Sequence, residues 1–313
     1  MTKQKLDRKR ALAWRVLLTL ALLLAAVYAV VRNWHTVDGS LRVARGSDPV
    51  WLAAALLLMA LTFCIAAAVY GVLALHRLRY WQTWLVSLAG AFVNRLLPSG
   101  LGGLGLSGVY LYRRGHSPAE ATVVVSVNNL LGIAAHVLLL AAIFALRPQV
   151  IQALFAGRHI GLSLNVGLAV VLVAGMLTCL PGVRRPLARF MWNLNRSVRH
   201  LKLAKVVLAL MLSALLTVTY TGILACTARS IGVELGVLQV FIVFSLGMLA
   251  GTATPTPGGL VGAEAGLFTG FTAYGVSVLD AGAAVLLFRL VTYWLPLFPG
   301  LLALLAGRKN GLI

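Results

Sequence analysis

The sequence has few acidic residues. Asp and Glu number 7 among 313 residues, against 27 Lys and Arg, which gives a formal net charge of +20. Charged residues make up only 11% of the chain and hydrophobic residues 60%, whereas about a quarter of the residues of a soluble domain are charged. This shortage of charge excludes a water-soluble globular domain and indicates an integral membrane protein.

Residues that carry catalytic chemistry are also scarce. The three cysteines, Cys64, Cys179 and Cys226, lie in apolar runs without paired spacing, so neither a disulfide framework nor a metal knuckle is indicated. No His, Asp and Glu cluster has metal-ligand spacing, and no Gly-rich loop carries the Lys-Ser/Thr of a nucleotide site. We therefore expect no cofactor, no metal and no ATP-driven transport by this chain alone.

The basic residues are grouped in short clusters between long apolar runs, as juxtamembrane anchors are. Their position indicates contact with anionic lipid, and nucleic acid is not expected as a partner in spite of the high net charge.

Six apolar segments reach the length of roughly 20 residues that a membrane-spanning helix needs. The first of them could be read as a signal peptide with a cleavage site at Val27-Tyr28-Ala29, but it is long for that purpose. The segments are 11–31, 50–75, 119–146, 162–180, 206–228 and 281–306.

Two further apolar stretches, 85–112 and 240–274, are interrupted by Pro and Gly, and each half is too short to span. Basic clusters place both termini and the 184–205 loop in the cytoplasm. With these points fixed, the first stretch begins and ends inside and the second begins and ends outside. The sequence thus predicts an all-α polytopic protein of the plasma (inner) membrane, with six full transmembrane helices and two opposed re-entrant hairpins. If one or both hairpins are counted as spans, the total is seven or eight spans.

An inverted repeat follows from this topology, with a span, a hairpin and a returning span in each copy. Both returning spans open on a capping box, Ser117 to Glu120 and Ser277 to Asp280. The predicted divisions are a basic segment, first span and outer loop (1–49), the first repeat (50–146), a connecting span and basic loop (147–205), the second repeat (206–306) and a tail (307–313).

Few charges remain at membrane depth, and these are the candidates for function. Glu264 is the carboxylate placed there, with Arg95 and Arg289 as possible partners, either in a structural ion pair or in a headgroup or proton site. Shifting the sequence by 160 residues, which aligns the two capping boxes, sets Asn129 against Arg289. The glycines of the hairpin tips permit either an anion site at a helix N-terminus or close helix packing.

The stretches Asn94 to Gly105 and Pro257 to Glu264, with Arg289 and Tyr293 in an Arg-x-x-x-Tyr ending, resemble a known family. This is the lysylphosphatidylglycerol synthase transmembrane (flippase) domain family, which includes the YbhN-like proteins; the similarity runs roughly from Trp51 to Ala306. The family implies movement of aminoacylated or other anionic phospholipids, or of polyprenyl-linked lipids, between leaflets. The chain departs from the family at Ser107-Gly108, where a basic residue is usual, and at Val261, where glycine is usual.

We expect a lipid translocase and not an enzyme, because the soluble aminoacyl-transfer domain of the synthases is absent from this sequence. A non-transporting scaffold or regulator and a small-solute or ion transporter remain as alternatives. Expected partners are membrane lipids, foremost anionic phospholipid, with a homo-oligomer and a separate synthase or glycosyltransferase left open. The predicted substrate-binding residues are Asn94, Arg95, Pro98, Gly102, Gly103, Asn129, Pro257, Gly258, Gly259, Glu264, Arg289 and Tyr293.

Overall fold

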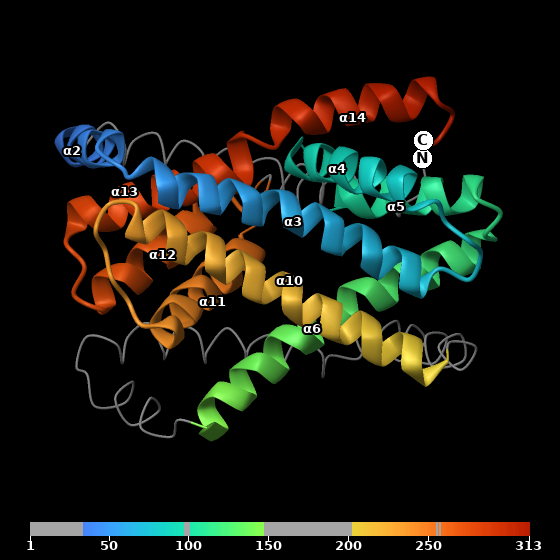
Figure 1. Ribbon diagram of the computed structural model, residues 1–313, viewed down its shortest axis with the longest axis horizontal. Helices are drawn as coiled ribbons and strands as arrows, with labels where there is room; N and C mark the ends of the chain where they lie inside the picture. Colours follow the sequence, from blue (N-terminus) through green and yellow to red (C-terminus); the bar gives the residue numbers. More distant parts are fainter. Residues whose placement is uncertain (1–33, 97–100, 147–201, 255, 257) are drawn as a thin grey trace, which may run out of the picture.

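The computed structural model describes residues 34–96, 101–146, 202–254, 256 and 258–313, and this part of the chain is helical and without strands (Figure 1). Within these described residues, four helical segments are long and apolar enough to cross a membrane. They are α3 (Pro49–Leu73), α6 (Pro118–Leu146), α10 (Leu203–Arg229) and a composite last span of α13 (Val278–Arg289), the π turn η1 (Leu290–Trp294) and α14 (Leu297–Lys309).

These four segments match four of the six predicted spans, so the chain is a multi-pass, all-α membrane protein. The predicted spans 11–31 and 162–180 lie outside the described residues. Helices α3 and α10 are antiparallel: the Asp48 N–H donates to the Ser230 carbonyl (2.7 Å) at one end, and Lys205 Nζ donates to the Ala74 carbonyl (3.3 Å) at the other. Among the described residues, the first and second hairpins, α6 and α13 all contact this pair.

Two helical hairpins occupy the broken stretches. The first consists of α4 (Tyr80–Leu96) and α5 (Leu101–Arg113), and the second of α11 (Val237–Ala253) and α12 (Gly262–Ala273). Each helix is shorter than the roughly 20 residues of a membrane crossing. The hairpins open at opposite ends of the bundle and point toward its middle (Figure 1).

Glycine allows the helices of each hairpin to approach closely. An added Cβ at Gly262 would lie 2.2 Å from Thr254 Oγ1, and one at Gly266 would lie 2.5 Å from the Leu246 carbonyl oxygen. In the first hairpin, a Cβ at Gly102 would lie 2.5 Å from the Val93 carbonyl oxygen. Close packing is therefore an established role of these residues, as small residues have between membrane helices.

The two hairpins lead into the returning helices through the same turn. Gly115 (φ +89°) and Gly275 (φ +81°) both take left-handed conformations that favour glycine. Both predicted capping interactions are present, since Ser117 Oγ accepts from the Glu120 N–H (3.2 Å) and Ser277 Oγ accepts from the Asp280 N–H (3.2 Å). The two returning helices therefore start from matched positions 160 residues apart.

The segment expected as an outer loop contains a helix, α2 (Trp34–Arg45), which lies along α13 (Figure 1). Its buried contact is made by small residues: a Cβ at Gly39 would lie 2.8 Å from Leu279 Cδ2, and Ser40 packs against Gly282. This short helix, with Arg42 and Arg45 in its last turn, has no long apolar run, so hydropathy does not predict it.

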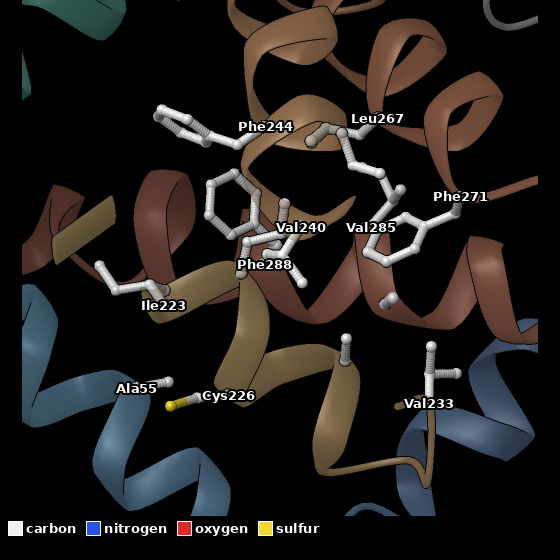
Figure 2. Close-up of a cluster of buried hydrophobic side chains, with 14 of the residues drawn as sticks. Ala55, Ile223, Cys226, Val233, Val240, Phe244, Leu267, Phe271, Val285 and Phe288 are labelled. Carbon is white, nitrogen blue, oxygen red and sulfur yellow. The ribbon is translucent and has the colours of Figure 1, made fainter. Parts of the chain in front are cut away.

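A cluster of buried apolar side chains fixes α12 and α13 relative to α10 and α11 (Figure 2). Its centre includes Phe244 and Phe288, whose rings meet edge to face at 6.4 Å, together with Leu267 and Phe271. Because Phe288 precedes Arg289 and Leu267 lies one turn after Glu264, this core determines where both charged side chains lie.

Candidate functional site

The last span is irregular in its middle, at η1. The Leu295 N–H bonds five residues back to the Leu290 carbonyl (2.9 Å), and Thr292 Oγ1 donates to the Phe288 carbonyl (2.6 Å). Pro296 has no N–H, so the Thr292 carbonyl receives no hydrogen bond from the position that would supply it in an α-helix. Such π turns are frequent at functional sites.

Arg95, in the last turn of α4, contacts this irregular turn. Its guanidinium donates to the carbonyls of Thr292 and, within its own helix, of Ala91 (2.5 Å). The Tyr293 hydroxyl donates in return to the Arg95 carbonyl (3.4 Å), and the guanidinium lies 5.5 Å from the centre of the Tyr293 ring. The first hairpin tip is thus joined to the middle of the last span.

Glu264 and Arg289 form the ion pair that the sequence suggested, and of the two candidate partners Arg289 is the one. Arg289 Nε donates to Glu264 Oε1 (2.6 Å), and Arg289 Nη2 reaches the Gly259 carbonyl (3.5 Å). The Arg289 side chain is 13% exposed and that of Glu264 32%. Glu264 lies in the first turn of α12, where the positive end of the helix dipole stabilises its negative charge.

Tyr293 lies between the two hairpin tips. The Arg289 guanidinium is 5.3 Å from its ring centre, close to the distance of Arg95. A Cβ at Gly258, in the second tip, would lie 2.4 Å from Tyr293 Cε2, so the ring packs directly on the backbone there. Tyr293 itself is 7% exposed.

The structure therefore brings together Arg95, Glu264, Arg289 and Tyr293, with Gly258 and Gly259 beside them. Two guanidinium groups and one carboxylate leave one formal positive charge. Glu264 Oε2 and Arg95 Nε are buried and lack a hydrogen-bond partner within the described residues. The free Arg95 Nε–H donor and the excess positive charge suit an anion, whereas Glu264 Oε2, an acceptor, suits a donor group.

Other predicted residues have structural partners or lie elsewhere. Asn94 Oδ1 accepts from the Gly103 N–H (3.2 Å), which caps the start of α5 from within the hairpin. Asn129 is exposed on α6, and no hydrogen bond joins it to the cluster among the described residues. Pro98 and Pro257 lie outside the described residues.

The family model described as the lysylphosphatidylglycerol synthase TM region matches residues 12–300. The chain belongs to this family. The resemblance seen in the hairpin tips is thereby confirmed, and membership indicates a membrane protein with a lipid-related function. A comparison with curated proteins gives no significant match. Over the residues that the structure describes, no group of three or more His, Cys, Asp or Glu side chains could hold a metal ion.

The departure from the family at Val261 has a structural consequence. Val261 precedes α12 with φ +74° and ψ −52°, a conformation that is costly for a β-branched residue. Glycine would adopt it without a Cβ clash. Backbone strain of this kind tends to occur near functional sites.

Sequence reasoning missed the link between Arg95 and Thr292. The signal was present in the position of Pro296, four residues after Thr292, because a proline there always withholds the helical N–H from that carbonyl. A proline within a span thus marks a free carbonyl, here that of Thr292.

Proposed function

We propose that the protein translocates a lipid between membrane leaflets and binds its headgroup where the two hairpin tips meet the last span. The observation that supports this most is the convergence of Arg95, Glu264, Arg289 and Tyr293 from three separate elements on one partly buried position. Charged groups within a membrane protein are costly, and such groups usually serve function. Membership of a lipid-related family agrees with the proposal.

The membrane frame of the proposal rests on the distribution of basic residues. One end of the bundle gathers the end of α3, the turn before α6, the start of α10 and the C-terminus (Figure 1). There the Leu75 N–H donates to His116 (3.2 Å), and Leu312 packs on Val86 and Tyr110. By the positive-inside rule this end is cytoplasmic and the hairpins are re-entrant from opposite faces. The basic residues of these segments are Arg77, Arg79, Arg113, Arg114, Lys202, Lys205, Arg308 and Lys309.

The charge of the cluster favours an anionic headgroup. One phosphodiester carries one negative charge, which would balance the formal excess of one positive charge among Arg95, Arg289 and Glu264. A guanidinium binds phosphate oxygens in a bidentate manner. Anionic phospholipids and polyprenyl-linked phosphates both satisfy this chemistry. The chain then acts as a non-enzymatic translocase in the plasma (inner) membrane, with both termini cytoplasmic, and a separate synthase or glycosyltransferase supplies the lipid.

A second candidate is a non-transporting scaffold. It is favoured by the internal partners of Asn94 and Arg95 and by the glycine-mediated packing of α11 against α12, all of which hold the hairpins in place.

Reconstitution in liposomes that contain headgroup-labelled lipids tests the two candidates. Wild-type protein is compared with Glu264→Ala and Arg289→Ala, and with the exposed control variants Glu234→Ala and Arg45→Ala. We expect inter-leaflet exchange of an anionic lipid with the wild type and the controls, and its loss in the site variants. Exchange that no site variant changes would contradict the assigned site, and absence of exchange with every lipid would favour the scaffold.

The opposed hairpins have their own test, by labelling single cysteines introduced at Arg114 and Ser277 in a background without native cysteines. The proposal expects Arg114→Cys to be labelled from the cytoplasmic side and Ser277→Cys from the other side. Labelling of both from one side would contradict the topology.

A further inference from the structure

We infer that Arg95 is a positioning residue, which stabilises the carbonyl that Pro296 leaves free and so holds Tyr293 between the hairpin tips, while Arg289 is the arginine that exchanges its partner for a headgroup. This division of roles rests on the proposed function.

The first support is the hydrogen-bond requirement of the last span. Thr292 lies in a membrane-spanning segment, and Pro296 cannot supply the N–H that an α-helix would give to the Thr292 carbonyl. Unsatisfied backbone groups are costly at membrane depth, so such a carbonyl needs a donor from another part of the protein. The Arg95 guanidinium is that donor.

The second support is that the contact is reciprocal. The last carbonyls of a helix lack intrahelical partners, and Arg95 lies in the last turn of α4. The Tyr293 hydroxyl donates to the Arg95 carbonyl (3.4 Å), next to the residue whose carbonyl accepts from Arg95. Each element thus satisfies a backbone group of the other, and Tyr293 is held against the second tip at Gly258.

The third support is the contrast with Arg289. The partners of Arg95 are backbone carbonyls, which are fixed by the helices that contain them. The main partner of Arg289 is the side chain of Glu264, which is 32% exposed and can rotate away. An arriving phosphate can replace a carboxylate side chain on Arg289 without breaking the fold, whereas it could replace the carbonyls on Arg95 only by releasing the last span.

A double-mutant cycle between Arg95 and Pro296 tests the inference, because Pro296→Ala restores an N–H in reach of the Thr292 carbonyl. Thermal unfolding in detergent and the lipid exchange rate in liposomes are measured for Arg95→Ala, Pro296→Ala and the double variant. We expect Arg95→Ala to slow lipid exchange about tenfold when Pro296 is present, the size expected for a lost charge-assisted hydrogen bond. In the Pro296→Ala background, the same substitution should slow exchange by less than about threefold. Unfolding temperatures should show the same rescue.

Three comparisons make the result specific. Pro299→Ala restores an N–H to a different carbonyl, that of Leu295, and should give no rescue. Arg95→Lys retains one donor and should retain most of the stability. Arg95→Met, which removes the donor but keeps an apolar side chain of similar length, replaces Arg95→Ala in the cycle if that variant does not fold. Arg95 variants should slow anionic and zwitterionic lipids by the same factor, whereas Arg289→Lys should change their ratio.

Equal losses in the two Pro296 backgrounds, or a changed lipid preference in Arg95→Lys, would overturn the inference and make Arg95 a headgroup ligand. Failure of the proposed function is distinguishable, since a wild type that moves no lipid would still show the cycle in thermal unfolding if Arg95 stabilises the Thr292 carbonyl.

Discussion

Arg289 Nε lies 2.6 Å from Glu264 Oε1, and this ion pair joins the last span to the first turn of α12. Among the described residues, the second hairpin makes one other polar contact with α13, between the Gly259 carbonyl and Arg289. The polar contacts of the first hairpin with the same span instead use backbone carbonyls, those of Thr292 and Arg95. The two tips therefore meet one span through contacts of different kinds.

Loss of one partner of this pair should destabilise the protein. Glu264→Ala leaves Arg289 charged and partly buried, and we expect about 2–3 kcal/mol lower free energy of unfolding, somewhat below the usual cost for a fully buried pair because Glu264 is 32% exposed. The double exchange Glu264→Arg with Arg289→Glu should recover part of the loss. Denaturant unfolding in detergent measures both; an exchange variant no more stable than Glu264→Ala would show that the pair does not stabilise the hairpin.

Gly258→Ala should disrupt the second tip. A Cβ there would lie 2.4 Å from Tyr293 Cε2, and φ is +61°, so the variant has both a clash with a buried ring and a strained backbone. We expect a lower unfolding temperature and slower lipid exchange. Gly105→Ala is the matched control, because its Cβ would meet nothing within 4 Å and alanine favours a helix. Equal effects of the two substitutions would contradict the contact with Tyr293.

Val261→Gly should stabilise the protein. The positive φ of Val261 costs about 1–3 kcal/mol, and the entropy that glycine loses on folding offsets about 0.5–1 kcal/mol of the gain. The control Val137→Gly, at an exposed position inside α6, should instead destabilise by about 1 kcal/mol. Opposite signs in denaturant unfolding are expected, and a destabilised Val261→Gly variant would show that the valine is not strained.

Much of this arrangement was readable from the sequence, because hydropathy, basic clusters and capping boxes are local signals. The broken stretches, the two capping boxes and the pairing of Glu264 with an arginine were predicted, and the structure contains them. Asn129 was aligned with Arg289 by the shift of 160 residues, yet it is exposed on α6, because the repeats do not place equivalent residues at one point. The contact of Arg95 depends on the Thr292 carbonyl. Pro296 marks this carbonyl as free, but no local signal in the sequence shows that Arg95 lies beside it.

Stability should fall in mild acid through His116, which lies between α5 and α6. Its Nε2 accepts from the N–H groups of Leu75 (3.2 Å) and His76 (3.3 Å), so the ring must be neutral and carry its proton on Nδ1, near the Leu111 carbonyl (3.1 Å). Burial lowers the pKa of His116 below its ordinary value. The unfolded chain therefore binds a proton at higher pH than the folded chain, and the stabilisation is complete above about pH 6.5 and decreases as pH falls below it.

Unfolding temperatures between pH 8 and pH 5 measure this dependence. The wild type should lose stability across the acidic half of the range, and His116→Gln, which keeps an acceptor but does not titrate, should show a flatter profile. The exposed His35→Gln is the control and should keep the wild-type slope. The ring of His76 meets that of His116 edge to face at 4.7 Å, so His76→Gln is measured in parallel. A profile that flattens only in the His76 variant would assign the effect to that residue instead.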